Sequence, residues 1–197
     1  RHALAYIKGL QEQGILACAK HFPGHGDTAV DSHLDLPVVS HNLERLNSVE
    51  LAPFKALLDK KIGGVMVAHL YVPALEKQSG IPASVSYDII TNLLKKSYQY
   101  NGLIITDALN MKGAIVADAK PGDIELQALL AGNDILLMSE NVKPAIEKIK
   151  TAIQKRKLRK SALDEKVRKI LMAKHWAGLY NYTPVDTTNL YYDLNNA

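Results

Sequence analysis

Four short apolar segments, each followed by a loop and then by a helical pattern, constrain the fold of this chain more than any other feature of its sequence. They occupy residues 15–19, 64–68, 103–106 and 134–138, and β-branched residues are most frequent in the second and third. Nearly continuous apolar runs of this length are typical of strands covered on both faces. Their alternation with helical patterns predicts parallel βα units, and hence an α/β fold.

The spacing of these units limits the choice of architecture. A complete (β/α)₈ barrel typically needs about 250 residues, whereas this chain has 197 and only 14 of them precede the first segment. The sequence therefore predicts either the second half of a barrel, with about four βα units, or a small open sheet. We favour the half barrel because polar residues collect after the carboxyl ends of the predicted strands. An open doubly wound sheet also places its site at these ends, so the open sheet stays an alternative.

Three helices carry readable start or stop signals. The pattern over 123–131 predicts a helix that ends at Gly132, where a left-handed residue is common. A helix near 51–59 is expected to begin close to Pro53, since proline is tolerated in a first turn. Residues 161–164 resemble a capping box, with Asp in place of Glu, and are expected to open a C-terminal helix.

Composition excludes some classes of function. The formal net charge is +4, but residues 143–169 hold 11 Lys or Arg and 3 Asp or Glu, so the rest of the chain is net acidic. Because the basic residues lie on predicted amphipathic helices with few aromatic residues among them, we expect a solvated face and no nucleic-acid partner. The single cysteine, Cys18, excludes an intrachain disulfide. No apolar run approaches the length of a membrane span.

The stretch that carries most chemistry, residues 20–33, holds three histidines, one lysine and two aspartates directly after the first predicted strand. A proline and two glycines permit tight turns, so Lys20 and His21 are expected at the strand end and Asp31 and His33 on a loop. In an extended loop, a spacing of two residues points the side chains of Asp31 and His33 the same way. The carboxylate can then orient the imidazole as a proton donor and acceptor that works near neutral pH.

Two other interpretations of this stretch were weighed. His25 lies between two glycines, and we expect it to shape the loop rather than to catalyse. A metal site built from His21, His25, Asp31 and His33 is chemically reasonable, but Lys20 lies among these residues and would compete with a cation. We therefore expect no metal and no organic cofactor.

Asp107 directly follows the predicted strand 103–106. A carboxylate at this position is costly unless it is hydrogen-bonded or used, and a strand end would hold a nucleophile rigidly. Strand-end aspartates also often cap the next helix, so Asp107 alone is a weak signal. Together with the first loop it supplies one carboxylate nucleophile and a separate proton shuttle, as double-displacement glycoside hydrolysis requires.

Residues 20–33 read K-H-F-P-G-H-G-D-T-A-V-D-S-H and resemble the signature of the β-N-acetylhexosaminidases of glycoside hydrolase family 3. Further similarity lies in residues 51–54, 65–69, 82–86, 105–107 and 131–138, so the resemblance covers residues 1–177. It implies a (β/α)₈ barrel whose first four strands, with their sugar contacts, are not in this chain. The partners implied are the missing N-terminal half of the barrel and a further C-terminal domain, to which residues 178–197 would lead as a linker or extended tail.

The resemblance also implies roles for individual residues. Asp107 matches the family's nucleophile, and His33 matches its general acid/base, with Asp31 as the partner of His33. Lys20 and His21 match residues that hydrogen-bond sugar hydroxyls.

Two further residues, His69 and Met111, are expected to line the sugar pocket. The implied activity is retaining hydrolysis of terminal N-acetylglucosamine from cell-wall muropeptides or related amino sugars. A β-glucosidase-type hydrolase of the same family and a non-catalytic sugar-binding fragment stay open as alternatives. An imidazole acid/base also leads to the hypothesis of phosphorolysis, because a neutral ring does not repel an incoming phosphate.

The chain begins at Arg1, inside a helical pattern, and we expect it to be part of a longer protein. No signal sequence is visible in it, which leaves the bacterial cytoplasm and the periplasm equally open.

Overall fold

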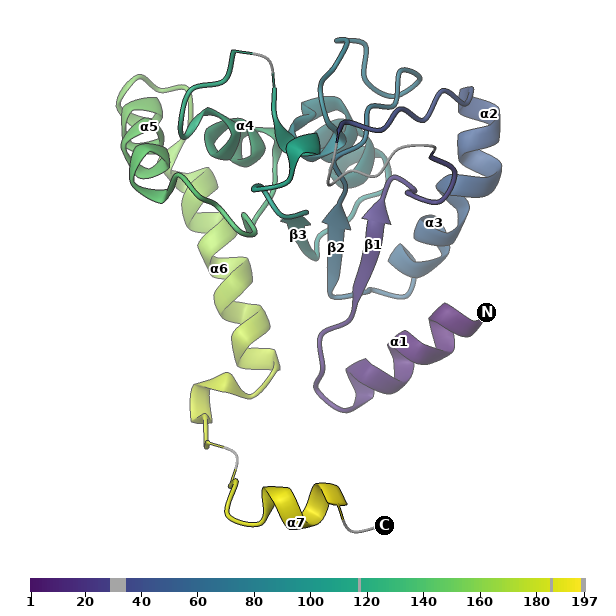
Figure 1. The fold of residues 1–197 in the computed structure, drawn as a ribbon, viewed down its shortest axis with the longest axis vertical. Helices are drawn as coiled ribbons and strands as arrows, with labels where there is room; N and C mark the ends of the chain where they lie inside the picture. Colours follow the sequence, from purple (N-terminus) through teal and green to yellow (C-terminus); the bar gives the residue numbers. More distant parts are fainter. Residues whose placement is uncertain (29–34, 117, 185, 196–197) are drawn as a thin grey trace.

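A parallel three-stranded sheet lies at the centre of the computed structural model, which describes residues 1–28, 35–116, 118–184 and 186–195 (Figure 1). The strands are β1 (Cys18–Phe22), β2 (Gly64–Val67) and β3 (Leu103–Thr106), in the order β1-β2-β3. Both neighbouring pairs are parallel. The expected α/β class with a parallel sheet is therefore confirmed.

The fourth predicted strand, residues 134–138, runs beside β3 without completing a regular ladder. Ile135 forms an isolated parallel bridge with Ile105, and the Leu109 amide donates to the Leu137 carbonyl at 2.9 Å. The Leu137 amide, however, donates to the side-chain Oγ1 of Thr106 at 3.0 Å. A hydroxyl thus takes the place of a backbone carbonyl, which interrupts the ladder.

The predicted bounds of the first strand were wrong. Residues 15–19 were expected, but β1 starts at Cys18 because Gly14 has a φ of 72° and the Ile15 amide donates back to the Leu10 carbonyl at 3.0 Å. Lys20 and His21 consequently lie inside β1 rather than after it. The pairing of β1 with β2 is irregular between Ala19 and Phe22. The Lys20–His21 and Phe22–Pro23 peptide bonds are cis.

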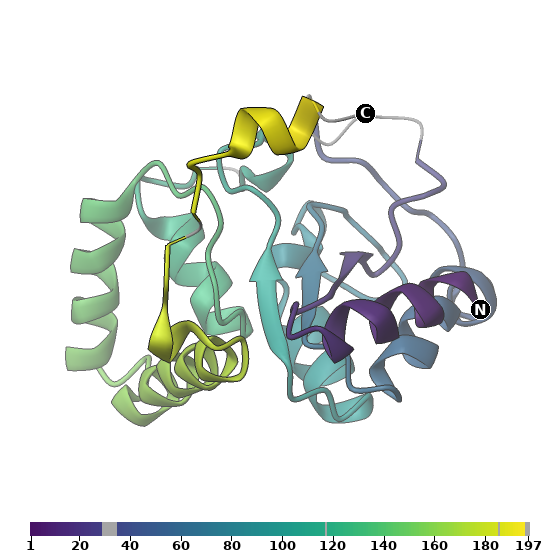
Figure 2. The ribbon, with the colours of Figure 1, turned by 90° about the horizontal axis from the view of Figure 1, so that it is seen from below.

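Helices flank the sheet on both sides, as Figures 1 and 2 show. On one side lie the elements around β1 and β2, and on the other lie α4, α5 and α6, which follow β3. The first set is α1 (His2–Glu12), α2 (Leu43–Arg45), η1 (Leu46–Glu50) and α3 (Ala52–Leu58). Two helices, η2 (Ala83–Val85) and η3 (Asp88–Ser97), connect β2 to β3. The elements after β3 are η4 (Lys112–Ala114), α4 (Asp123–Ala131), α5 (Val142–Gln154), α6 (Lys160–Trp176), η5 (Leu179–Asn181) and α7 (Leu190–Asn195).

The helix signals had mixed outcomes. The predicted helix 123–131 is confirmed as α4, which Gly132 ends with a φ of 127°, and α3 does carry its proline in the first turn. The capping box was wrong, because α6 begins at Lys160 and has no side-chain cap. Asp164 instead pairs with Lys160 at 3.3 Å, so its carboxylate is used elsewhere.

The main core packs between the sheet and the helices that flank it. Fully buried side chains from all three strands contribute to it, including Phe22, Val67 and Ile104, together with Leu94 from η3. Burying each such side chain stabilises the fold by roughly 1.5–3 kcal/mol relative to leaving it exposed. The core therefore fixes the strand ends that carry the polar residues. In the part of the chain that the structure describes, none of the helices is long and apolar enough to cross a membrane.

Candidate active site at the carboxyl ends of the strands

The Asp107 carboxylate is held rigidly where β3 ends. The Asp107 amide donates to the Val67 carbonyl of β2 at 2.9 Å, and the Ala108 amide donates to Asp107 Oδ1 at 2.9 Å. The side chain is 14% exposed, and its second oxygen, Oδ2, lies 3.8 Å from His21 Nε2. One carboxylate oxygen is thus fixed by the backbone, while the other is directed toward the neighbouring imidazole of β1.

His21 is a half-buried imidazole whose charge is disfavoured. Burial lowers the pKa of His21, Asp107 raises it, and the positive charges of Lys20 and His25 lower it again. The net effect is a pKa below the ordinary value for histidine. A neutral ring has one nitrogen that donates and one that accepts, which suits hydrogen bonds to hydroxyl groups.

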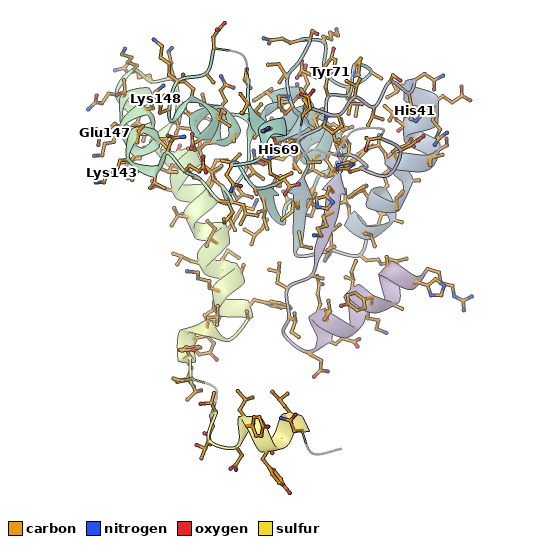
Figure 3. The ribbon with its side chains drawn as sticks, viewed as in Figure 1. His41, His69, Tyr71, Lys143, Glu147 and Lys148 are labelled. Carbon is orange, nitrogen blue, oxygen red and sulfur yellow. The ribbon has the colours of Figure 1, made fainter. Side chains whose placement is uncertain are left out.

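His69 lies near the middle of the molecule (Figure 3) and is fully buried. Its Nε2 lies 3.0 Å from the Ala108 carbonyl and its Nδ1 lies 2.7 Å from Ser84 Oγ. Because a carbonyl can only accept, Nε2 carries the proton and Nδ1 accepts from the Ser84 hydroxyl. Burial lowers the pKa of His69, although the Ala108 bond and Asp107 oppose this shift. The structure therefore makes His69 part of the wall that supports residue 108, with both ring nitrogens occupied.

The other residues singled out from the sequence are placed as follows. Lys20 is exposed on β1, one residue before His21, and Met111 is buried in the turn after β3, where its amide donates to the Ala108 carbonyl at 3.1 Å. The structure therefore brings His21, His69 and Asp107 together, while Lys20 directly precedes His21 and Met111 follows Asp107 by four residues. Asp31 and His33 lie outside the described residues.

The loop that follows β1 packs against its own strand. The rings of His25 and His21 meet edge to face with centroids 6.1 Å apart, and Thr28 Oγ1 lies 3.1 Å from His25 Nδ1. The loop-shaping role expected of His25 agrees with these contacts.

The sequence reasoning missed a group of ionic side chains beneath this loop. Asp27 Oδ2 lies 2.8 Å from His41 Nε2, and Arg45 Nη2 lies 3.5 Å from Asp27 Oδ2 and 3.1 Å from Glu50 Oε1. The signal that could have revealed the group is the acidic Glu50, which directly precedes the apolar 51–54 segment. We call Asp27, His41, Arg45 and Glu50 the anchoring network.

The anchoring network also contains three atoms that could ligate a metal. The ligand atoms of Asp27, His41 and Glu50 lie within 4.8 Å of one another. The Arg45 guanidinium, however, contacts both carboxylates. The positive charge that these carboxylates require is thus supplied by the chain itself.

A parallel α/β domain with a carboxylate and imidazoles at the carboxyl ends of its strands is a fold on which many enzymes carry their sites. The family profile described as "Glycosyl hydrolase family 3 N terminal domain" matches residues 1–173. The chain belongs to glycoside hydrolase family 3.

Individual relatives agree with this family. The chain is 40% identical over 146 residues to a protein named "Beta-hexosaminidase A" from Pseudoalteromonas piscicida. The matched region covers 68% of this chain and 24% of that protein. Among solved structures, a family 3 β-N-acetylglucosaminidase from Paenibacillus sp. str. FPU-7 superposes with a TM-score of 0.83 at 36% identity, over 91% of this chain and 34% of that one. "Beta-glucoside phosphorylase BglX" superposes with a TM-score of 0.83 at 25% identity, over 92% and 34%. The chain therefore spans about a third or less of the length of these relatives.

Proposed function

We propose that the protein containing this chain is a retaining exo-β-N-acetylglucosaminidase that removes terminal N-acetylglucosamine from cell-wall muropeptides or related amino sugars. The observation that carries the proposal is the Asp107 carboxylate at the end of β3, with Oδ1 held by the Ala108 amide and Oδ2 3.8 Å from His21. The names of the Pseudoalteromonas and Paenibacillus relatives support the substrate class.

In the first chemical step, Asp107 Oδ2 attacks the anomeric carbon of the sugar. The bond from that carbon to the leaving oxygen breaks, and His33 gives this oxygen a proton, with Asp31 orienting the ring. The product is a glycosyl ester on Asp107. In the second step, His33 takes a proton from water, which attacks the same carbon and releases Asp107 as the carboxylate.

The remaining residues bind and support. The low pKa of His21 favours a neutral ring, and Lys20 and His21 would hydrogen-bond the sugar hydroxyls. Met111 would contribute an apolar wall. His69, with both nitrogens bonded to protein, would keep Ala108 and hence Asp107 in place.

We also propose that residues 1–177 form the second half of a (β/α)₈ barrel, and that residues 178–197 link it to a further domain. This is supported by the small share of each relative that the chain covers. It is also supported by an apolar hollow at the amino ends of the strands, lined by Leu16 and Leu103 and by Met172 and Trp176 of α6. The other half of the barrel would cover such a surface. At the opposite, carboxyl ends of the strands, it would complete the sugar site.

Phosphorolysis is a second candidate because one solved relative is named a β-glucoside phosphorylase. In that reaction, phosphate rather than water attacks the glycosyl ester. A neutral imidazole near the site does not repel this anion as a second carboxylate would.

One experiment tests both candidates. The full-length protein is incubated with p-nitrophenyl N-acetyl-β-glucosaminide, with and without inorganic phosphate, and the products are separated. Hydrolysis gives free N-acetylglucosamine, whereas phosphorolysis gives its 1-phosphate. Preference for p-nitrophenyl β-glucoside would favour the β-glucosidase alternative, and no release from either substrate would favour a non-catalytic sugar-binding protein.

A further inference from the structure

A chain of buried hydrogen bonds runs from η2 to the candidate nucleophile. It starts at the Ser84 hydroxyl, passes through the His69 ring and reaches Ala108, whose amide donates to Asp107 Oδ1 at 2.9 Å. Ser84 and His69 are both fully buried, so bulk water does not compete for their bonds. A hydroxyl of η2 is therefore connected, through one imidazole ring, to the residue that holds the carboxylate.

The Ser84 hydroxyl completes the bonding of the His69 ring. The Ala108 carbonyl can only accept, so Nε2, 3.0 Å away, carries the ring proton and Nδ1 is left with a lone pair. Ser84 Oγ lies 2.7 Å from Nδ1 and donates to it. A buried acceptor without a donor is unfavourable. Without this hydroxyl, the ring orientation that serves Ala108 would leave Nδ1 unpaired and would lose its advantage over other orientations.

Residue 108 transmits the orientation of the ring to Asp107. The Ala108 carbonyl accepts from His69 Nε2 and from the Met111 amide at 3.1 Å, while the Ala108 amide donates to Asp107 Oδ1. The Asp107 amide is bonded in turn to the Val67 carbonyl at 2.9 Å. A change in the orientation of residue 108 would therefore move the amide that fixes Oδ1 and would let the carboxylate rotate.

The backbone of Ser84 is held without help from its hydroxyl. Its amide donates to the Ala68 carbonyl at 3.1 Å, and its carbonyl accepts from Asn133 Nδ2 at 2.8 Å. Asn133 is fully buried and also donates to the Ala128 carbonyl of α4 at 2.7 Å. Removing only the hydroxyl therefore leaves these backbone bonds in place and changes the support of the His69 ring.

We propose that Ser84 is a positioning residue for the nucleophile, acting through His69 and Ala108 on the Asp107 carboxylate. This inference rests on the proposed function and adds a residue from η2 to the group that serves Asp107. Ser84 does not touch the substrate, so its loss should lower kcat and leave KM nearly unchanged.

The test measures the nucleophile directly, using 5-fluoro-N-acetylglucosaminyl fluoride as the probe. Asp107 Oδ2 attacks the anomeric carbon of this sugar, the bond from that carbon to fluorine breaks, and fluoride leaves with the electron pair. The ester that forms is slow to hydrolyse, so it is detected as added mass on the peptide that contains Asp107. Because fluoride leaves without a proton, the trapping rate reports on Asp107 rather than on the acid.

The full-length unsubstituted protein is compared with Ser84→Ala and Ser84→Cys. A displacement of about 1 Å at a catalytic group costs on the order of 10²-fold in rate, so we expect Ser84→Ala to slow trapping by about 10- to 100-fold. Its kcat on p-nitrophenyl N-acetyl-β-glucosaminide should fall by a similar factor. Ser84→Cys keeps a weak donor at this position and should recover part of both rates, and it carries the test if Ser84→Ala fails to fold.

Ser86→Ala is the matched control. Ser86 is a buried serine that directly follows η2, and its hydroxyl donates to Glu76 Oε2 and accepts from the Ile89 amide. Losing these bonds should lower the melting temperature, as the loss of a buried hydroxyl does in Ser84→Ala. The trapping rate and kcat of folded Ser86→Ala should nevertheless stay within about twofold of the unsubstituted protein, since its bonds lead away from His69.

Two measurements test whether Ser84 acts through His69. In a double-mutant cycle, adding Ser84→Ala to His69→Ala should slow trapping no further, because the two residues belong to one path. Nitrogen NMR should show that the Nδ1 resonance of His69, assigned by its absence from His69→Ala, shifts in Ser84→Ala toward that of an acceptor without a donor. A merely structural serine would not move this resonance.

The possible outcomes separate this inference from the proposed function. An unchanged trapping rate in Ser84→Ala or, if that variant does not fold, in Ser84→Cys would overturn the inference alone. Equal losses in Ser84→Ala and Ser86→Ala, or fully additive losses in the double-mutant cycle, would also overturn it. No cleavage by the unsubstituted protein, or trapping on a residue other than Asp107, would overturn the proposed function and this inference with it.

Discussion

Lys166 on α6 allows a quantitative prediction about stability. Its ammonium group is buried and donates to the Asn133 carbonyl at 2.7 Å. Burial, with the positive charge of Lys95 adding to it, lowers the pKa of Lys166 to about 8 from 10.5. Because one pKa unit corresponds to about 1.36 kcal/mol, keeping this group charged in the folded state costs about 3 kcal/mol at neutral pH.

The cost depends on pH in a defined direction. Below about pH 8 the lysine is charged in both the folded and the unfolded state, so the full cost is present. Between about pH 8 and 10.5 the unfolded state binds more protons than the folded state, so the free energy of unfolding rises with pH. Lys166→Met removes this contribution. Relative to the Met variant, the unsubstituted protein should therefore gain about 3 kcal/mol of stability between pH 7.5 and 10.5.

Urea denaturation of both proteins at several pH values measures this difference, and Lys160→Met, which removes an exposed lysine from the same helix, is measured beside them as a control. Taking the difference at each pH removes the contribution of other titrating groups that the substitution does not affect. The reasoning is refuted if the gap between the unsubstituted protein and Lys166→Met stays constant across the range.

Three further predictions concern the candidate site. Asp107→Ala should abolish release of p-nitrophenol from the N-acetylglucosaminide in the full-length protein, and activity retained within tenfold would remove Asp107 from the nucleophile role. His33→Ala should lose several orders of magnitude in kcat on natural substrates while accepting activated aryl leaving groups better; equal losses would argue against an acid role. His69→Ala should lower the free energy of unfolding, measured in urea, because it leaves the buried Ser84 hydroxyl without its acceptor, which costs about 1–3 kcal/mol; no change would mean that this hydroxyl finds another acceptor.

The order of strands and helices could be predicted because it depends on short-range patterns. Apolar runs located β2 and β3 to within one residue, and Gly132 located the end of α4. The exact start of β1 could not be predicted, because Gly14 and the Ile15 amide continue the turn after α1. The broken pairing of residues 134–138 depends on a hydroxyl of another strand, which no local pattern reveals.

The candidate site likewise contains residues that could be predicted from the sequence and residues that could not. Asp107 and His21 could be found because each stands at or near a strand end, where parallel strands bring side chains together. The supporting groups could not, since Ser84 and Arg45 matter only through contacts made with distant residues in the folded chain. Among these supporting groups, only Glu50 could have been expected to be a buried charge, because it directly precedes an apolar segment.

Position 24 has two separate reasons to be glycine. Its φ of +139° disfavours any side chain, and the space that a methyl group would fill is already taken by Glu50. If all twenty amino acids are introduced at position 24, only the variants with glycine should be functional. Engineers who wish to alter the loop would do better to vary Gly26, where a Cβ meets no atom of the described residues within 4 Å.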